Sequence, residues 1–126
     1  MAKFYKCALC GSVVVKLNAE GCEPSCCGKP MEELIPGTVD AAVEKHVPAV
    51  VEKENKVYVQ VGEVIHPMLE NHYIEWIYLL TDKGGTFHFL KPGDEPKTVF
   101  PLLEDEVVLE VYAYCNLHGL WKANLD

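Results

Sequence analysis

The chain has 126 residues, of which 49% are hydrophobic, so it can form one ordinary domain, or a compact domain beside a smaller one, and extensive disorder is excluded. Its formal net charge is −8 and all 11 basic residues are lysines, which argues against nucleic-acid binding, because that function usually needs a basic surface and arginine side chains. No apolar run reaches the roughly 18 residues of a membrane-spanning helix, and the start of the chain does not read as a signal peptide. We therefore expect a cytoplasmic protein with no membrane partner, in which thiols stay reduced and clustered cysteines bind metal rather than form disulfides.

The first part of the chain, which ends near the turn pair Pro36-Gly37, is rich in cysteine. Five of the six cysteines lie there: Cys7, Cys10, Cys22, Cys26 and Cys27. A segment this short cannot bury a sufficient core, and usually needs a metal ion or disulfides to fold.

The run CALCG forms a C-x-x-C motif from Cys7 to Cys10, followed by a glycine that relieves the tight turn. Its two thiolates would face one ion, and two of the three later cysteines would complete a tetrahedron. The spacing does not select which two. Tetrahedral sulfur suits zinc and iron alike, so the donors predict a tetrathiolate centre without naming its metal.

The rest of the chain is expected to be mostly β-strand. Period-two alternation of β-branched and aromatic residues appears in three runs: KVYVQVGEV (56–64), HYIEWIYLL (72–80) and VVLEVYAY (107–114). Turn sequences TDKGG and KPGDEP separate such runs, and VDAAVEKH (39–46) is interpreted as a short helical turn that ends before Pro48. About 90 residues of this kind favour an antiparallel sandwich or barrel, and the length suits a seven-stranded sandwich.

A second group of metal-binding side chains is predicted at strand ends and in loops of this second part. Its members are His46, His66, His72, His118 and Cys115. The fifth histidine, His88, stands mid-strand between aromatic residues and is interpreted as structural. Four imidazoles and one thiolate exceed what a structural zinc site uses, so a five-coordinate iron with one vacant position is the favoured interpretation.

The motifs YKCALCG, CCGKPM, EKHVP, HPM, HYIEWI, FLKPGD and AYCNLHGLWKA follow one another along nearly the whole chain. In this order they resemble the desulfoferrodoxin family, the two-iron superoxide reductases. The resemblance implies a desulforedoxin-like domain over residues 1–36, followed by an immunoglobulin-like antiparallel β-sandwich over residues 37–126 that carries the catalytic iron.

The resemblance also implies the ligands of both irons. In the first domain they would be Cys7, Cys10, Cys26 and Cys27. In the second domain they would be His46, His66, His72 and His118 in a plane, with Cys115 as the axial thiolate. The sixth position would be open, with Lys45 and Glu44 over it. Cys22 has no counterpart in the family pattern.

The activity that the resemblance implies is the one-electron reduction of superoxide to hydrogen peroxide, which detoxifies superoxide under oxidative stress. A small electron donor such as rubredoxin and a homodimeric assembly are expected as well. The alternatives are a rubredoxin-like electron-transfer protein without catalysis at the second site, a zinc-stabilised binding module, and a superoxide dismutase. Backbone amides at Leu117 and His118, and the side chain of Asn116, are candidate hydrogen-bond donors to the Cys115 sulfur.

Overall fold

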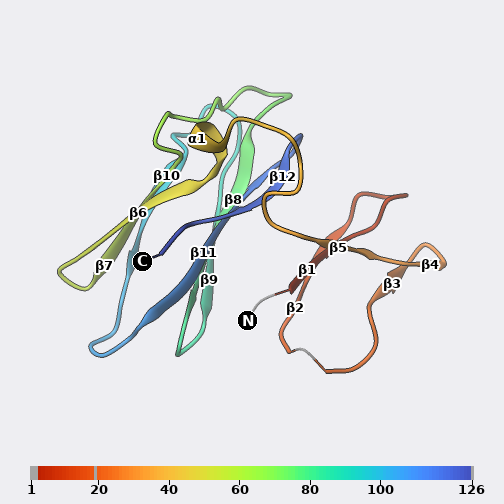
Figure 1. The fold of residues 1–126 in the computed structure, drawn as a ribbon, viewed down its shortest axis with the longest axis horizontal. Helices are drawn as coiled ribbons and strands as arrows, with labels where there is room; N and C mark the ends of the chain where they lie inside the picture. The colour runs from red at the N-terminus through yellow and green to blue at the C-terminus, as the bar shows by residue number, and fades with distance from the viewer. Residues whose placement is uncertain (1–2, 19, 126) are drawn as a thin grey trace. The chain divides into compact units, whose positions relative to one another are not determined.

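The computed structural model describes residues 3–18 and 20–125 and divides the chain into two compact units, residues 1–35 and 36–126. The N-terminal unit consists of five short strands: β1 (Lys3–Lys6), β2 (Val13–Lys16), β3 (Ser25–Cys26), β4 (Lys29–Pro30) and β5 (Glu32–Leu34). Strand β1 lies between β2 and β5 in an antiparallel sheet, and β3 pairs with β4 (Figure 1). Among the described residues of this unit, Tyr5, Cys7 and Met31 form a small buried apolar cluster, and Phe4 is buried as well, so packing contributes little to holding the unit together.

The C-terminal unit begins with one turn of helix and continues with strands. Its elements are α1 (Val43–His46), β6 (Pro48–Lys53), β7 (Lys56–Val61), β8 (Ile74–Thr81), β9 (Gly85–Phe89), β10 (Lys97–Pro101), β11 (Val108–Cys115) and β12 (Gly119–Lys122). Across residues 3–18 and 20–125, no helix has the length and apolar character needed to cross a membrane.

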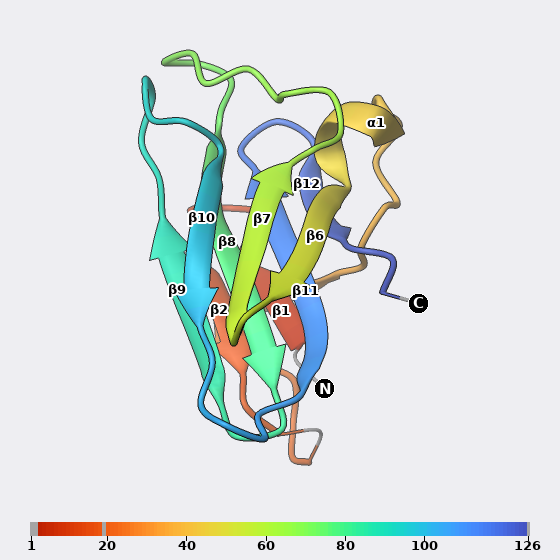
Figure 2. The same cartoon turned by 90° about the vertical axis from the view of Figure 1, so that its left-hand side faces the viewer.

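The seven strands of this unit form two sheets. One has the order β10-β7-β6 and the other the order β12-β11-β8-β9, and all neighbouring strands are antiparallel. Figure 2 shows β6, β7 and β10 as one layer in front of the layer that contains β8, β9 and β11. The predicted antiparallel β-sandwich is therefore confirmed, and the barrel is not formed.

Alternate residues of the central strands build the core between the sheets. Val57, Val59 and Val61 of β7 are buried, as are Val111 and Ala113 of β11, and the same apolar cluster includes Cys115 at the end of β11. This is the period-two pattern that the sequence predicted. This apolar cluster thus anchors the end of β11, where Cys115 of the second metal-binding group stands.

Candidate metal centres

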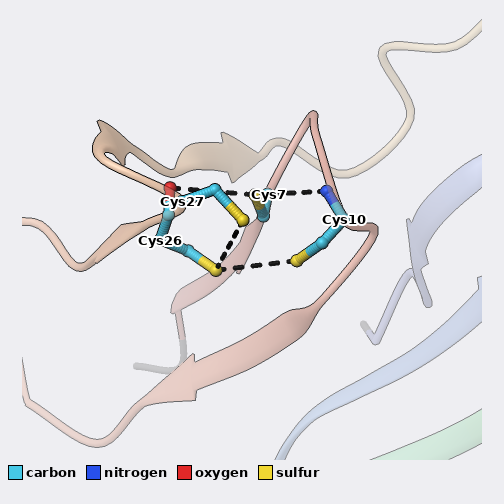
Figure 3. A group of neighbouring side chains, drawn as sticks. All are labelled: Cys7, Cys10, Cys26 and Cys27. Carbon is cyan, nitrogen blue, oxygen red and sulfur yellow. Dashed lines mark hydrogen bonds between the residues drawn. The ribbon is translucent and has the colours of Figure 1, made fainter.

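Four cysteines of the N-terminal unit come together from two segments. Cys7 and Cys10 stand on the turn after β1, while Cys26 and Cys27 stand on the β3–β4 hairpin (Figure 3). The C-x-x-C turn is closed by two backbone bonds, in which Gly11 N–H donates to Cys7 O at 2.9 Å and Cys7 N–H donates to Ser12 O at 2.9 Å. The positive φ of Gly11, 80°, lets the chain turn immediately after Cys10.

The separations of the sulfur atoms match a tetrahedral metal site. Sγ of Cys26 lies 3.6 Å from Sγ of Cys10 and 3.9 Å from Sγ of Cys27, and all four sulfurs lie within 4.8 Å of one another. A tetrahedron with metal–sulfur bonds of about 2.3 Å has sulfur–sulfur edges of about 3.8 Å, whereas a disulfide bond is about 2.05 Å. The spacing therefore fits four thiolates around one ion.

The backbone conformation at Cys27 and Gly28 allows the adjacent side chains of Cys26 and Cys27 to point to one ion. Cys27 has a positive φ of 53°, and the next residue, Gly28, has 75°, so the chain reverses sharply and the two neighbouring thiols converge. Cys22 is exposed, and the group of four cysteines that could hold a metal does not contain it.

The turn also favours an ionised thiol. Backbone N–H groups of Cys10 and Leu9 point at the Cys7 sulfur and lower the pKa of that thiol to about 6. Hydrogen bonding to the Cys10 thiol raises the pKa of Cys26 to about 12, because the neighbouring sulfurs would otherwise bring negative charges together. A cation among the four sulfurs would remove this repulsion.

The second cluster gathers at one end of the sandwich from three segments. These are α1, the long connection between β7 and β8, and the turn between β11 and β12 (Figures 1 and 2). They supply the five predicted side chains: His46, His66, His72, Cys115 and His118. His88 lies in β9, opposite Ile77, and is not a member of this cluster.

The four imidazole rings form a square. Going round it, the ring centroids of His46–His66, His66–His72, His72–His118 and His118–His46 are 4.6, 4.7, 5.1 and 4.9 Å apart, with interplanar angles of 80 to 85°. The diagonal pair, His46 and His72, is 6.4 Å apart. Nε2 of His46 lies 3.1 Å from both Nε2 of His66 and Nδ1 of His118. Metal–nitrogen bonds of about 2.1 Å at right angles would place adjacent nitrogens about 3.0 Å apart, so the square fits one ion.

Backbone carbonyl groups orient the two most buried rings. Nδ1 of His46 donates to Ala42 O at 2.7 Å, and Nδ1 of His66 donates to Pro67 O at 2.6 Å, which leaves each Nε2 lone pair facing the centre of the square. Burial lowers the pKa of His46 and His72, and that of His66 to about 4, so these imidazoles are neutral and able to bind a metal. Nε2 of His72 is buried without a hydrogen-bond partner, as expected of a metal-binding nitrogen.

Cys115 lies on the buried side of this cluster. Its side chain is fully buried, and its Sγ is 3.9 Å from Nδ1 of His118. Burial raises the pKa of the Cys115 thiol, and backbone N–H groups of His118 and Leu117 oppose that rise, so both predicted amide donors are present. The side chain of Asn116 is not a donor to this sulfur, because the atom that faces Cys115 Sγ, at 4.0 Å, is the acceptor Oδ1, while Nδ2 donates to Asn71 O at 3.1 Å.

The opposite side of the cluster is the more exposed one. His72 and His118 are only half-buried, and the helix α1 presents Glu44 and Lys45 as exposed side chains beside the buried His46. Burial is the main cause of the lowered pKa of His72, and the positive charges of His118 and Lys45 contribute to it. The cluster thus has a thiol on its buried side and a lysine near its solvent side.

Three supporting residues were not singled out as such from the sequence. Trp121 is buried, donates from Nε1 to His118 O at 2.9 Å and packs on the His46 ring with centroids 5.0 Å apart. Met68 accepts the Ile74 N–H at its sulfur at 3.3 Å, which fastens the loop between His66 and His72. Gly62, which directly follows β7, lies against the backbone of α1.

Replacing Gly62 by alanine is expected to displace α1 and weaken metal binding at the second cluster about tenfold. A Cβ atom at residue 62 would lie 2.7 Å from Glu44 O and 2.8 Å from Val47 O, and these backbone atoms can give way only if α1 moves. Metal titration of the metal-free variant measures the effect. Gly84→Ala is the matched control, since its Cβ would meet nothing within 4 Å. If Gly62→Ala and Gly84→Ala bind the metal equally tightly, the added methyl group at residue 62 does not disturb the second cluster.

The two clusters define a class of protein: a non-haem metalloprotein with one tetrathiolate centre and one centre of four imidazoles and a thiolate. The family model described as desulfoferrodoxin matches residues 38–124, and that of the desulfoferrodoxin N-terminal domain matches residues 1–34. The chain belongs to the desulfoferrodoxin family. Family and donor sets together assign iron to both centres.

Known proteins match the chain over almost its full length. The desulfoferrodoxin homolog of Archaeoglobus fulgidus is 49% identical over 119 residues, which are 94% of each chain. The desulfoferrodoxin of Nitratidesulfovibrio vulgaris is 49% identical over 121 residues, 96% of this chain and 94% of that one. The crystal structure of the superoxide reductase from Treponema pallidum matches with a TM-score of 0.82 and 37% identity, covering 98% of this chain and 99% of that chain.

Proposed function

We propose that this protein is a superoxide reductase that converts superoxide to hydrogen peroxide at the second centre. The observation that carries the proposal is the square of four imidazole rings, with a buried thiol on one side and solvent-exposed residues near the other. An ion held by these five donors would have one position left for a small substrate. Bound ferrous iron would supply the single electron that, with two protons, turns superoxide into hydrogen peroxide.

The roles of the donors follow from their placement. We assign the ligands of this centre as His46, His66, His72, His118 and Cys115. Burial lowers the pKa of His46, His66 and His72, so these three rings bind as neutral ligands, and the thiolate is the one anionic ligand. Backbone N–H groups of Leu117 and His118 stabilise its negative charge in a buried environment. The ligands of the first centre are assigned as Cys7, Cys10, Cys26 and Cys27.

Lys45 attracts the substrate in this proposal. Superoxide is an anion, and the chain carries a formal charge of −8, so the protein as a whole repels it. The exposed ammonium group of Lys45, which directly precedes His46 on α1, reverses that repulsion locally, over a range of about 10 Å at 0.1 M salt. Glu44, next to it on α1, is assigned the role of an anionic group that approaches the open position after the product has left.

Lys45→Ala is expected to lower the second-order rate constant for superoxide about tenfold, and to make that constant less sensitive to salt. Pulse radiolysis over a range of ionic strengths measures both quantities. Lys53→Ala is the matched control, because Lys53 is also exposed but stands at the far end of β6 from α1. If both substitutions lower the second-order rate constant by the same small factor, Lys45 acts only through the net charge of the protein.

Each of the two units is assigned a role, and the protein is expected to have an electron donor and a second copy of itself as partners. Residues 1–36 would act as a desulforedoxin-like iron domain and residues 37–126 as the catalytic domain, in line with the two compact units. A small electron donor such as rubredoxin would return the second centre to its ferrous state. The protein is expected to be a homodimer and to act in the cytoplasm.

The products of the reaction test the proposed function. A superoxide reductase forms one molecule of hydrogen peroxide for each superoxide and releases no oxygen, when a reductant is present. A dismutase forms one peroxide and one oxygen for every two superoxides. A rubredoxin-like carrier with an inert second site would accept electrons without accelerating the removal of superoxide. Either of the last two results would refute the proposal.

A further inference from the structure

The side chain of Asn116 joins two segments that carry different ligands of the second centre. Asn116 follows Cys115 in the turn between β11 and β12. Its Oδ1 accepts the Tyr73 N–H at 2.9 Å, its Nδ2 donates to Asn71 O at 3.1 Å, and its own N–H donates to Tyr73 O at 3.2 Å. These three bonds hold the residues on both sides of His72, so Asn116 links the Cys115 turn to the His72 loop.

The hydrogen bonds of Asn116 lie at the point where the regular pairing of β11 with β8 is interrupted. The register of β11 against β8 shifts between Tyr114 and Cys115, so the regular ladder is interrupted as the strands approach the cluster. An asparagine side chain carries one carbonyl and one NH₂ group, so it can pair with a backbone N–H and a backbone C=O as a further residue of a strand would. Asn116 thereby continues the pairing beyond the interruption.

Asn116 does not act on the sulfur as a donor. Its Oδ1 lies 4.0 Å from the Cys115 Sγ, and its NH₂ group is bound to Asn71 O. Its influence on the centre therefore runs through the backbone. A change in its bonds would move the Cys115 turn relative to His72, because Cys115 ends β11 whereas His72 lies in the connection between β7 and β8.

We propose that Asn116 is a positioning residue that fixes the separation of Cys115 and His72, and so determines how firmly the second centre holds its metal. The inference rests on the proposed function, because it takes both residues as ligands of one ion. Groups that orient metal ligands commonly affect metal affinity about 10- to 100-fold when they are removed.

The test compares two variants at residue 116 with a control at residue 71. Asn116→Asp keeps the shape and the acceptor for Tyr73 N–H, but replaces the NH₂ donor by an oxygen that repels Asn71 O. Asn116→Ala removes both side-chain bonds. Asn71→Ala leaves the backbone carbonyl that accepts the bond, and its side chain is exposed, so it should behave as the wild type.

The readout is the loss of iron to a chelator, followed optically in fully loaded protein. The tetrathiolate centre of each sample, which belongs to the other unit, serves as an internal reference for the concentration of loaded protein. We expect both variants at residue 116 to lose iron from the second centre at least about tenfold faster than Asn71→Ala, and to shift the thiolate absorption band of that centre, with the first centre unchanged. The shift in the band is a readout that a loss of overall stability would not produce.

Two results would overturn the inference, and they are distinguishable. If the wild type shows the thiolate band of the second centre, but the variants at residue 116 keep its position and its rate of iron loss, Asn116 does not position the ligands. If the wild type itself lacks that band when loaded with iron, the proposed function fails, and the inference fails with it.

Discussion

Cys115→Ala is expected to lower the rate constant for superoxide by more than about 100-fold, and to abolish the long-wavelength absorption of the second centre. The substitution removes the one anionic ligand, which stands at the end of β11 with its side chain fully buried. Removal of a group that only orients a ligand costs up to about 100-fold, so removal of the ligand itself should cost more. Stopped-flow or pulse-radiolysis kinetics, beside an optical spectrum of the ferric protein, measures both effects.

Cys22→Ser is the matched control for this experiment, since Cys22 is exposed and outside both clusters. It should leave the rate constant and both absorption features unchanged. The first centre of Cys115→Ala should also keep its spectrum, because its four thiols belong to the other unit. Full activity in Cys115→Ala would contradict the assignment of the buried thiol as a ligand.

Cys10→Ser is expected to remove the first iron and to unfold much of the N-terminal unit. The described residues of that unit have a small apolar cluster around Tyr5 and Met31, so bound metal supplies most of its stability. Iron analysis should fall from two atoms per chain to one, and amide hydrogen exchange should become fast in residues 3–18 and 20–35. The second centre should keep its spectrum.

Cys22→Ser again provides the comparison, now within the same unit as Cys10. It should retain two irons per chain, because the exposed Cys22 lies outside the group of four thiols. Loss of the first iron in Cys22→Ser, with retention in Cys26→Ser or Cys27→Ser, would show that Cys22 is the true ligand.

The fold was predictable because its pattern is local. Alternation in residues 56–64 places the apolar side chains of β7 on one face, and β8 and β11 form at the other two runs, 72–80 and 107–114, although both faces of these two strands are buried. The pairing order of the two sheets depends on contacts between residues far apart in the sequence, so the pattern alone left both a sandwich and a barrel open.

The first centre was only partly predictable from spacing. The C-x-x-C motif selects Cys7 and Cys10 because its turn is a local structure. Its partners depend on the φ of Cys27, 53°, which brings neighbouring thiols together, and a positive φ at a cysteine has no signal in the sequence. Spacing therefore left Cys22, Cys26 and Cys27 open, and only the family resemblance favoured the last two.

The supporting residues of the second centre were the hardest to predict. Five donors in loops indicated a site, but their arrangement as a square depends on three connections meeting at one end of the sandwich. Asn116 was taken for a donor to the Cys115 sulfur because the two are adjacent in sequence. The structure directs its amide to the loop that carries His72 instead, a contact across 45 residues.

The most direct test of the account is an anomalous-scattering map of the iron-loaded protein, recorded at the iron absorption edge. Two iron peaks are expected in each chain. One would lie among the thiols of the N-terminal unit, and the other at the centre of the four imidazole rings, about 2.1 Å from their nitrogens and bonded to Cys115. A map with iron only among the N-terminal thiols, and none within the square of rings, would contradict it.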